Sequence, residues 1–236
     1  AGEDDAPPPA LTARVCDGLA CDMRGGRKLL EQLPGSLGEQ ARVVRAPCMG
    51  RCYVAPVAEV GQHFVDRASV PAVGAAVDAG DTAPIVPPYD DLDAYLAGGG
   101  YGYLRRCLAG EVSPTDVISH LNAAGLRGLG GAGFGPGRPW EIVRGQPGPR
   151  LLAVTADVGE PGTFKDRFYL ESSPHQILEG TLIAAWAVEA ATVYFYLRDE
   201  YPGIYRILES EIPRLEEAGL TPHTQLELRR GAGAYI

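Results

Sequence analysis

The stretch Gly125-Leu-Arg-Gly-Leu-Gly-Gly-Ala-Gly-Phe-Gly-Pro-Gly137, the glycine loop, decides how the second half of this chain is interpreted. Six of its glycines lie between Gly125 and Gly135. Because glycine has no side chain, the backbone can approach a ligand closely and its free N–H groups can form an anion cradle. The loop therefore predicts a site for a phosphate-bearing cofactor, with four glycines as binding positions: Gly128, Gly130, Gly131 and Gly133.

A glycine-rich loop alone is a weak signal, and this one fits neither common nucleotide-binding pattern. It lacks the Gly-Lys-Ser/Thr ending of a P-loop, and Pro136 stands where the dinucleotide pattern requires a third glycine. The segment that follows is more informative. An apolar strand is expected over residues 151–155, and it leads into the acidic turn Ala156-Asp-Val-Gly-Glu-Pro-Gly-Thr-Phe-Lys-Asp-Arg167.

The glycine loop and the acidic turn together resemble the NADH-oxidising, FMN-binding subunit of respiratory complex I. The same family includes subunits of NAD-linked formate dehydrogenases and NAD-reducing hydrogenases. The resemblance covers roughly residues 121–236 and implies FMN and NAD(H) as cofactors. It continues through three further motifs: Pro174-His-x-x-x-Glu-Gly180, Tyr194-x-Tyr-x-Arg-Asp-Glu-Tyr-Pro202 and Arg230-Gly-Ala-Gly-Ala-Tyr235.

The resemblance also implies roles for individual residues. The glycine loop and Asp157 would belong to the FMN site, and Tyr235 would lie beside the flavin. Phe134 would stack on NADH, and Glu160 would contact the nicotinamide nucleotide. No side chain is expected to be catalytic, because FMN and the clusters carry the chemistry. On the residues alone, Phe134 could instead be a hydrophobic plug, and residues 165–167 a solvated charge run.

Several positions depart from the family pattern. Pro139 stands where the family has lysine, and Arg138 is one residue away from it. Thr155 and Val158 replace an amide and a carboxylate expected near the flavin, and Leu129 replaces an arginine. These changes leave open a flavin-free electron relay or assembly subunit as an alternative function.

Four of the five cysteines form two tight pairs, Cys16-x4-Cys21 and Cys48-x3-Cys52. Four thiolates from two loops can provide the protein ligands of a [2Fe–2S] cluster. Structural zinc sites usually have two-residue spacing within each pair, and a thioredoxin-type redox site needs Cys-x-x-Cys. The spacing therefore predicts a [2Fe–2S] cluster, with a zinc-binding interaction module as the alternative. The fifth cysteine, Cys107, is expected to be a packed thiol.

The pattern around these cysteines predicts a thioredoxin-like order of strand, helix, strand, strand and helix. The expected segments are 11–15, 25–33 ended by Pro34-Gly35, 41–46, 54–60 and 69–79. The motifs Val15-Cys-Asp-Gly-Leu-Ala-Cys21 and Ala46-Pro-Cys-Met-Gly-Arg-Cys-Tyr-Val-Ala-Pro56 resemble the thioredoxin-like [2Fe–2S] subunit of the same enzymes. Pro56 stands where the thioredoxin fold has a cis-proline.

We expect an α/β fold in two domains. A disordered lead-in (1–10) precedes the thioredoxin-like [2Fe–2S] domain (11–80), a proline-rich linker (81–90) and the FMN/NAD-binding domain (91–236). Strands expected at 151–155, 192–198 and 225–229 alternate with helices, which favours a parallel sheet that binds flavin at its strand ends. The second domain is expected to be incomplete, with the family's [4Fe–4S] region beyond residue 236.

The charge distribution argues against several classes of partner. The net charge is −9 with lysine and arginine scattered along the chain, so nucleic acid and anionic membranes are not expected partners. The sequence has no run of eighteen apolar residues and no secretory signal pattern, so we expect no direct membrane insertion and a cytoplasmic location.

These inferences predict the diaphorase module of an NAD-linked redox complex, in which hydride transfer between NAD(H) and FMN is coupled to one-electron transfer. Fusion of the two domains resembles the NAD-dependent formate dehydrogenase beta subunit most. The resemblance then implies a hetero-oligomer whose catalytic alpha subunit carries iron–sulfur clusters and a molybdenum or tungsten cofactor. The alternative parents are an NAD-reducing hydrogenase and complex I.

Overall fold

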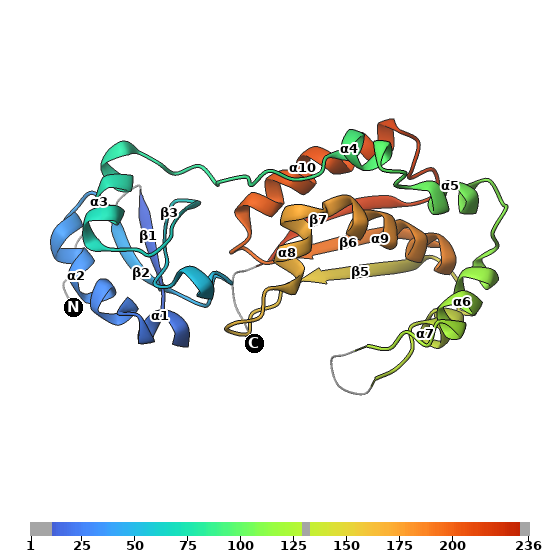
Figure 1. Ribbon diagram of the computed structural model, residues 1–236, viewed down its shortest axis with the longest axis horizontal. Helices are drawn as coiled ribbons and strands as arrows, with labels where there is room; N and C mark the ends of the chain where they lie inside the picture. The colour runs from blue at the N-terminus through green and yellow to red at the C-terminus, as the bar shows by residue number, and fades with distance from the viewer. Residues whose placement is uncertain (1–10, 129–132, 232–236) are drawn as a thin grey trace.

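The computed structural model describes residues 11–128 and 133–231 of the chain (Figure 1). Four positions discussed above lie outside the described residues: Leu129, Gly130, Gly131 and Tyr235. The lead-in over residues 1–10 lies outside them as well. Each half of the chain has its own sheet and its own apolar core. None of the described helices is both long enough and apolar enough to cross a bilayer.

The first half contains a four-stranded sheet with the order β2-β1-β3-β4, in which β1 and β2 are parallel and the other pairs antiparallel. Its strands are β1 (Thr12–Cys16), β2 (Arg42–Ala46), β3 (Ala58–Val60) and β4 (His63–Val65). Its helices are α1 (Leu19–Met23), α2 (Gly26–Leu37), the 3-10 helix η1 (Cys52–Val54) and α3 (Val70–Ala79). The sheet and α2 share one apolar core.

Helix α2 does not end where the sequence predicts. It runs through Pro34 to Leu37, so the expected stop at Pro34-Gly35 is wrong. Proline removes one backbone hydrogen bond from a helix. However, Leu29, Leu33 and Leu37 repeat at four-residue spacing and are all buried, and burying Leu37 offsets that loss.

The single strand predicted over residues 54–60 is also wrong in part. Residues 52–54 form η1, and only Ala58–Val60 is a strand, paired with β1 on one side and β4 on the other. Between them the Ala55–Pro56 peptide bond is cis. This arrangement turns the chain sharply after the second cysteine pair.

The second half contains a three-stranded sheet with the order β5-β6-β7, and all its strands are parallel, as predicted. The strands are β5 (Arg150–Ala156), β6 (Ala190–Leu197) and β7 (Gln225–Arg230). The helices are α4 (Leu92–Ala97), α5 (Gly102–Leu108), α6 (Pro114–Ala123), α7 (Gly137–Arg144), α8 (Lys165–Ser172), α9 (Pro174–Val188) and α10 (Pro202–Glu217). Helix α8 was not predicted, because its first residues were assigned to the acidic turn.

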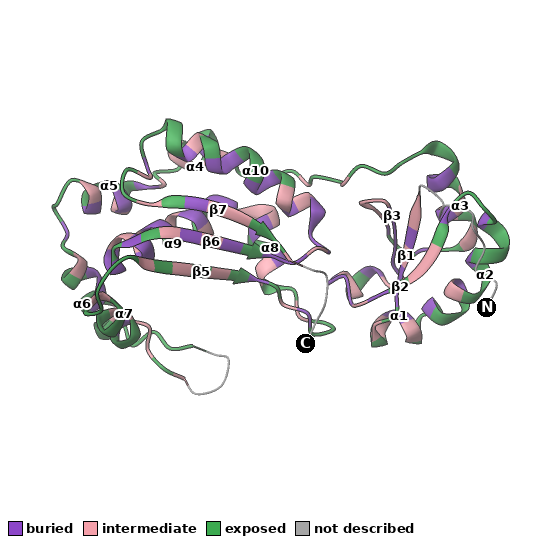
Figure 2. Cartoon of the chain, turned by 180° about the vertical axis from the view of Figure 1, so that it is seen from behind, coloured by how far each residue is buried: buried purple, intermediate pink, exposed green. Residues whose placement is uncertain are grey.

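The core of this half lies between the sheet and α9, which crosses one face of it (Figure 1). Val193 and Phe195 of the central strand are almost fully buried, with Leu178 of α9 in the same cluster. Of the three strands of this sheet, β6 is buried at the most positions (Figure 2). On the other face, Tyr196 is 40% exposed. The carboxyl end of β5 leads directly into the acidic turn.

A buried polar network joins the helices of this half. Glu211 of α10 accepts hydrogen bonds from His175 Nε2 (2.9 Å), the Leu92 backbone N–H (3.1 Å) and the Tyr89 hydroxyl (2.9 Å). His175 Nδ1 in turn lies 2.9 Å from the hydroxyl of buried Tyr101. A neutral His175 that donates from Nε2 and accepts at Nδ1 satisfies every one of these groups, and burial lowers the pKa of His175 accordingly.

Candidate functional site

The structure brings the four paired cysteines together at one end of the first sheet. Cys16 ends β1, Cys21 lies in α1, and the cysteine loop (residues 48–52) that follows β2 carries the other two. The Cys48 and Cys52 sulfurs are 3.4 Å apart, and the Cys16 thiol lies close to those of Cys21 and Cys48. None of these thiols is in a disulfide.

The four sulfurs form two close pairs and do not converge on a single point. Across residues 11–128 and 133–231, no three His, Cys, Asp or Glu side chains are grouped as they would be around a single metal ion. A [2Fe–2S] cluster takes four terminal thiolates divided between two irons. Two adjacent pairs match that requirement.

A backbone donor reaches the sulfurs from the acidic turn. Gly162 donates its backbone N–H to Cys52 Sγ (3.3 Å), and such hydrogen bonds to sulfur are typical of iron–sulfur sites. A Cβ at Gly18 would lie 3.2 Å from Cys48 Cβ and 3.5 Å from Cys16 Sγ. The residues present therefore fit an iron–sulfur group, since hydrogen bonds to sulfur and the space between the thiols are both provided.

The cysteine loop packs directly against the acidic turn and the end of β6, as Figure 1 shows. The Arg167 guanidinium lies over the Tyr53 ring (5.1 Å) and the Phe164 ring (5.8 Å). Within the predicted charge run over residues 165–167, Arg167 is only 5% exposed. It forms a buried contact between the two halves. Gly50 faces Tyr201 in the same interface.

A substitution at Gly50 tests how closely the cysteine loop must approach Tyr201. Its φ is +70°, and an added Cβ would lie 3.2 Å from the Tyr201 ring and hydroxyl. Gly50→Ala should therefore destabilise the chain by about 1–2 kcal/mol through backbone strain and also change the cluster's visible absorption. Gly110→Ala is the matched control, because φ is +76° there but no atom lies within 4 Å of the added Cβ. Identical spectra for both variants would contradict the close contact.

The flanks of the glycine loop border a cavity of about 590 Å3, a volume typical of small-molecule sites. The loop is closed at its base by a hydrogen bond from Gly128 N–H to the Phe134 carbonyl (3.0 Å) and by one from Arg127 to the Gly133 carbonyl (3.1 Å). Phe134 is 76% exposed and lines this cavity. Its ring is therefore free to stack on a ligand and is not a hydrophobic plug.

The cavity also meets the charge requirement of a phosphate. Arg127 and Arg138 line it, and Pro139 lies beside them. Arg138 is thus placed to supply the charge that the family's lysine would give at position 139. With the glycine backbone at the loop base, these residues fit a phosphate-bearing cofactor.

The acidic turn carries the other candidate residues of the nucleotide site. Asp157 and Glu160 are exposed just after β5, and the acidic turn continues from the carboxyl end of that strand (Figure 1). Among the described residues, no hydrogen bond joins the flanks of the glycine loop to this turn. The roles of these residues stay predictions.

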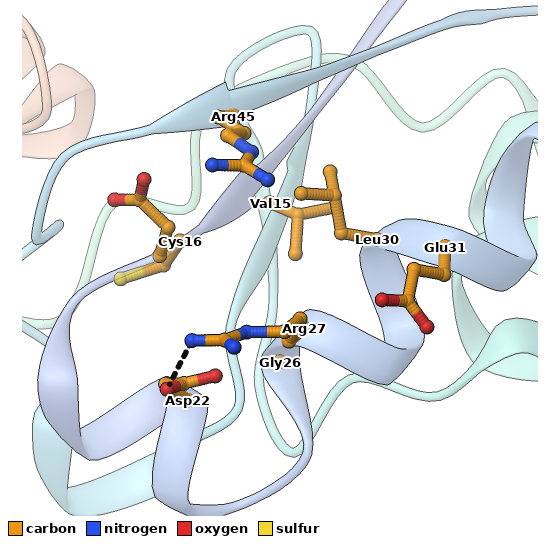
Figure 3. Close-up of a pocket in the computed structure, with 9 residues that line it drawn as sticks. Val15, Cys16, Asp22, Gly26, Arg27, Leu30, Glu31 and Arg45 are labelled. Carbon is orange, nitrogen blue, oxygen red and sulfur yellow. Dashed lines mark hydrogen bonds and ion pairs between the residues drawn. The ribbon is translucent and has the colours of Figure 1, made fainter.

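A second cavity, of about 380 Å3, lies beside Cys16 on the outer side of the first sheet. Figure 3 shows Arg27 extending to Asp22, with which it forms an ion pair of 2.9 Å. Glu31 and Arg45 add charges of both signs to the lining. This mixture gives the cavity no clear preference for one class of ligand.

Family models match both halves of the chain. Residues 4–80 match the thioredoxin-like [2Fe-2S] ferredoxin family, and residues 121–236 match the Nuo51 FMN-binding domain. The two halves of the chain are therefore similar, in this order, to a thioredoxin-like [2Fe-2S] ferredoxin domain and a Nuo51 FMN-binding domain. This result confirms the predicted fold class.

Individual relatives narrow the resemblance. The chain is 42% identical over 160 residues to an NADH-quinone oxidoreductase subunit of Rhizobium meliloti (strain 1021), covering 64% of this chain and 38% of that protein. It is 39% identical over 158 residues to an NADH-quinone oxidoreductase subunit of Aquifex aeolicus (strain VF5), covering 64% and 37%. The chain thus spans less than two fifths of the length of these curated relatives.

A solved structure covers both halves at once. A crystal structure of NAD+-reducing [NiFe]-hydrogenase in the air-oxidized state superposes with a TM-score of 0.79 at 26% identity, covering 98% of this chain and 44% of that one. The fused arrangement seen here is therefore similar to the one in that enzyme.

The residues that join the two halves could not be singled out from the sequence. Arg198 and Tyr201 lie within the motif spanning residues 194–202, but the resemblance of this motif to the family assigns no role to either residue. Gly162 and Tyr53 stand next to predicted site residues. A signal was available in the clustering of arginine and aromatic residues near both motifs, which is typical of buried contacts.

Proposed function

We propose that this chain is the NADH-oxidising diaphorase module of an electron-transfer complex of the complex I or NAD-reducing hydrogenase type. One observation carries the proposal above all. The acidic turn, which holds the candidate nucleotide-site residue Glu160, donates a backbone hydrogen bond from Gly162 to the candidate cluster ligand Cys52 (3.3 Å). The segments proposed to hold the nucleotide and the cluster are therefore in contact, a proximity that favours electron transfer between the two groups.

The residues of this chain hold and orient the two groups. When bound, FMN exchanges a hydride with nicotinamide and single electrons with iron–sulfur centres. The glycine loop and Asp157 would hold FMN, with Arg127 and Arg138 near the phosphate, while Phe134 and Glu160 would bind the nicotinamide nucleotide. The four paired cysteines would hold the [2Fe–2S] cluster.

The parent complex differs from the one favoured by sequence. The relatives described above are NADH-quinone oxidoreductase subunits and an NAD+-reducing hydrogenase, which favours the alternative parents over formate dehydrogenase. We therefore propose that the chain belongs to a hetero-oligomeric complex of the complex I or NAD-reducing hydrogenase type. A molybdenum or tungsten partner, a [4Fe–4S] region and a cytoplasmic location rest on sequence alone.

A visible absorption spectrum of the purified protein, with iron, sulfide and flavin analysis, tests this function. Flavin absorbance that bleaches on addition of NADH, together with iron and sulfide, is the expected result. Iron and sulfide without flavin would make the chain a relay subunit. Zinc without colour would overturn the cluster assignment.

The flavin-free relay is kept as the second candidate because of one observation. The backbone carbonyl of Val158, where the family has a carboxylate, is occupied by hydrogen bonds from Arg198 (2.7 Å) and Tyr201 (3.3 Å). This position thus contributes to the interface between the two halves, and its side chain offers the flavin no polar group.

Phe134 provides a test of the nucleotide site. Phe134→Ala should weaken NADH binding by about 1–2 kcal/mol, or roughly 5- to 30-fold, because base-on-ring stacking is worth that much. The dissociation constant can be measured by fluorescence titration. Phe168→Ala is the control, since Phe168 is also exposed (57%) but packs edge-on against its neighbour Tyr169 and does not line the cavity beside the glycine loop. Equal binding by both variants would remove Phe134 from the site.

A further inference from the structure

Arg198 makes contacts that no predicted site residue makes. It follows β6 and is 6% exposed. Its Nη2 donates to the Cys48 backbone carbonyl (2.6 Å), its Nη1 to the Val158 carbonyl (2.7 Å) and its Nε to the Glu200 carboxylate (2.9 Å). One side chain therefore joins the cysteine loop to the acidic turn.

The environment keeps this guanidinium charged and fixed. Burial alone would disfavour its charge, but the nearby Glu200 carboxylate, itself 7% exposed, raises the pKa of Arg198. The guanidinium also lies 5.3 Å from the centre of the Tyr201 ring. A planar guanidinium with donors on three nitrogens can serve three acceptors in fixed directions, whereas a lysine ammonium cannot reproduce that fork.

The two carbonyls that Arg198 joins belong to functionally distinct segments. Cys48 is a predicted cluster ligand, and Val158 stands between Asp157 and Glu160 in the predicted flavin and nucleotide site. The Gly162 N–H bond to Cys52 is a second, parallel link between the same segments. Together they define how the cluster ligands lie against the acidic turn.

We propose that Arg198 is a positioning residue that sets the placement of the cluster ligands relative to the flavin and nucleotide site. The proposal rests on the proposed function, because it assumes that both groups are bound. Losing the fork removes one of the two links between the cysteine loop and the acidic turn, while the Gly162 bond to Cys52, all four cysteines and the glycine loop remain. The effect should therefore fall mainly on electron transfer from reduced flavin to the cluster.

The test uses the full chain, loaded with cluster and FMN and reduced by NADH in a stopped-flow instrument. In Arg198→Gln and Arg198→Lys, cluster reduction should slow by about 10- to 100-fold, the usual cost of losing a residue that orients metal ligands. Flavin bleaching should slow much less. Arg206→Gln is the control, because Arg206 is half-exposed and, among the described residues, forms an ion pair only with Glu209 of the same helix. Wild-type rates of cluster reduction in both Arg198 variants would overturn the proposal.

A second measurement does not depend on turnover. The electron paramagnetic resonance spectrum of the dithionite-reduced cluster should change in the Arg198 variants and not in Arg206→Gln, since Arg198 binds the carbonyl of a ligand residue. If Arg198 variants do not fold, Glu200→Gln loosens the same fork and should alter the spectrum in the same direction. An unchanged spectrum there would contradict the proposal. Wild-type protein that takes up neither iron nor flavin would instead refute the proposed function.

Discussion

Replacing Cys48 with alanine should remove the cluster: bound iron, sulfide and the associated visible absorbance fall to near zero. Cys48 is buried, its sulfur lies 3.4 Å from that of Cys52, and its thiol is also close to that of Cys16, so it lies between the two sulfur pairs. Three thiolates cannot complete the four terminal positions. The Arg198 bond to residue 48 uses the backbone carbonyl and survives the substitution, so the loss is one of ligation.

Cys107→Ala is the matched control for this loss. Cys107 is equally buried, but it lies on α5 in an apolar cluster with Val112 and Val117. We expect this variant to lose about 1 kcal/mol of stability and to keep its full iron content. Iron analysis after anaerobic reconstitution separates the two variants. Iron retained by Cys48→Ala, or lost equally from both, would refute the cluster assignment.

The grouping of the four paired cysteines could be predicted from sequence because cysteine pairs at short spacing carry few alternative meanings. The parallel sheet could be predicted for a similar reason, since apolar strands alternate with amphipathic helices. Both inferences use local pattern only. They required no knowledge of how the two halves meet.

The interface could not be predicted, because its contacts join residues far apart in the sequence. The Arg198 bond to the Cys48 carbonyl spans 150 positions, and the Gly162 bond to Cys52 spans 110. Neither uses a periodic or spaced motif. The continuation of α2 through Pro34 was missed for a related reason, since the burial of Leu37 is tertiary.

For the same reason, only some features of the candidate nucleotide site could be predicted from sequence. Phe134 and Glu160 could be named because motifs surround them, but the positive charge near the glycine loop could not be located. Only the structure shows that Arg127 and Arg138 line one cavity. The polar network around Glu211 gave no sequence signal, because its members come from four separate segments of the chain.

Glu211→Ala should destabilise the flavin-binding half by about 3–5 kcal/mol, the usual cost of removing one partner from a buried charged network. The substitution leaves His175, Tyr89 and the Leu92 N–H without their acceptor, and it removes one of the carboxylates that pair with Arg214 (3.0 Å). Such a loss is a large share of the stability of an ordinary domain. Urea denaturation measures it. Glu209→Ala on the same helix is the control and should change stability by less than about 0.5 kcal/mol, because Glu209 is 50% exposed.

The same network should make stability fall at acid pH. Burial opposes the charge of Glu211, but hydrogen bonds led by His175 and Tyr89 outweigh it and hold the pKa of Glu211 below its ordinary 4.5. Burial also holds the pKa of His175 below 6.5. Both groups thus bind protons more weakly when folded, so the His175 contribution declines below about pH 6.5 and that of Glu211 below about pH 4.5. The stability gap between wild type and Glu211→Ala should therefore narrow below pH 4.5, and a gap independent of pH would show that Glu211 is not charged in the folded protein.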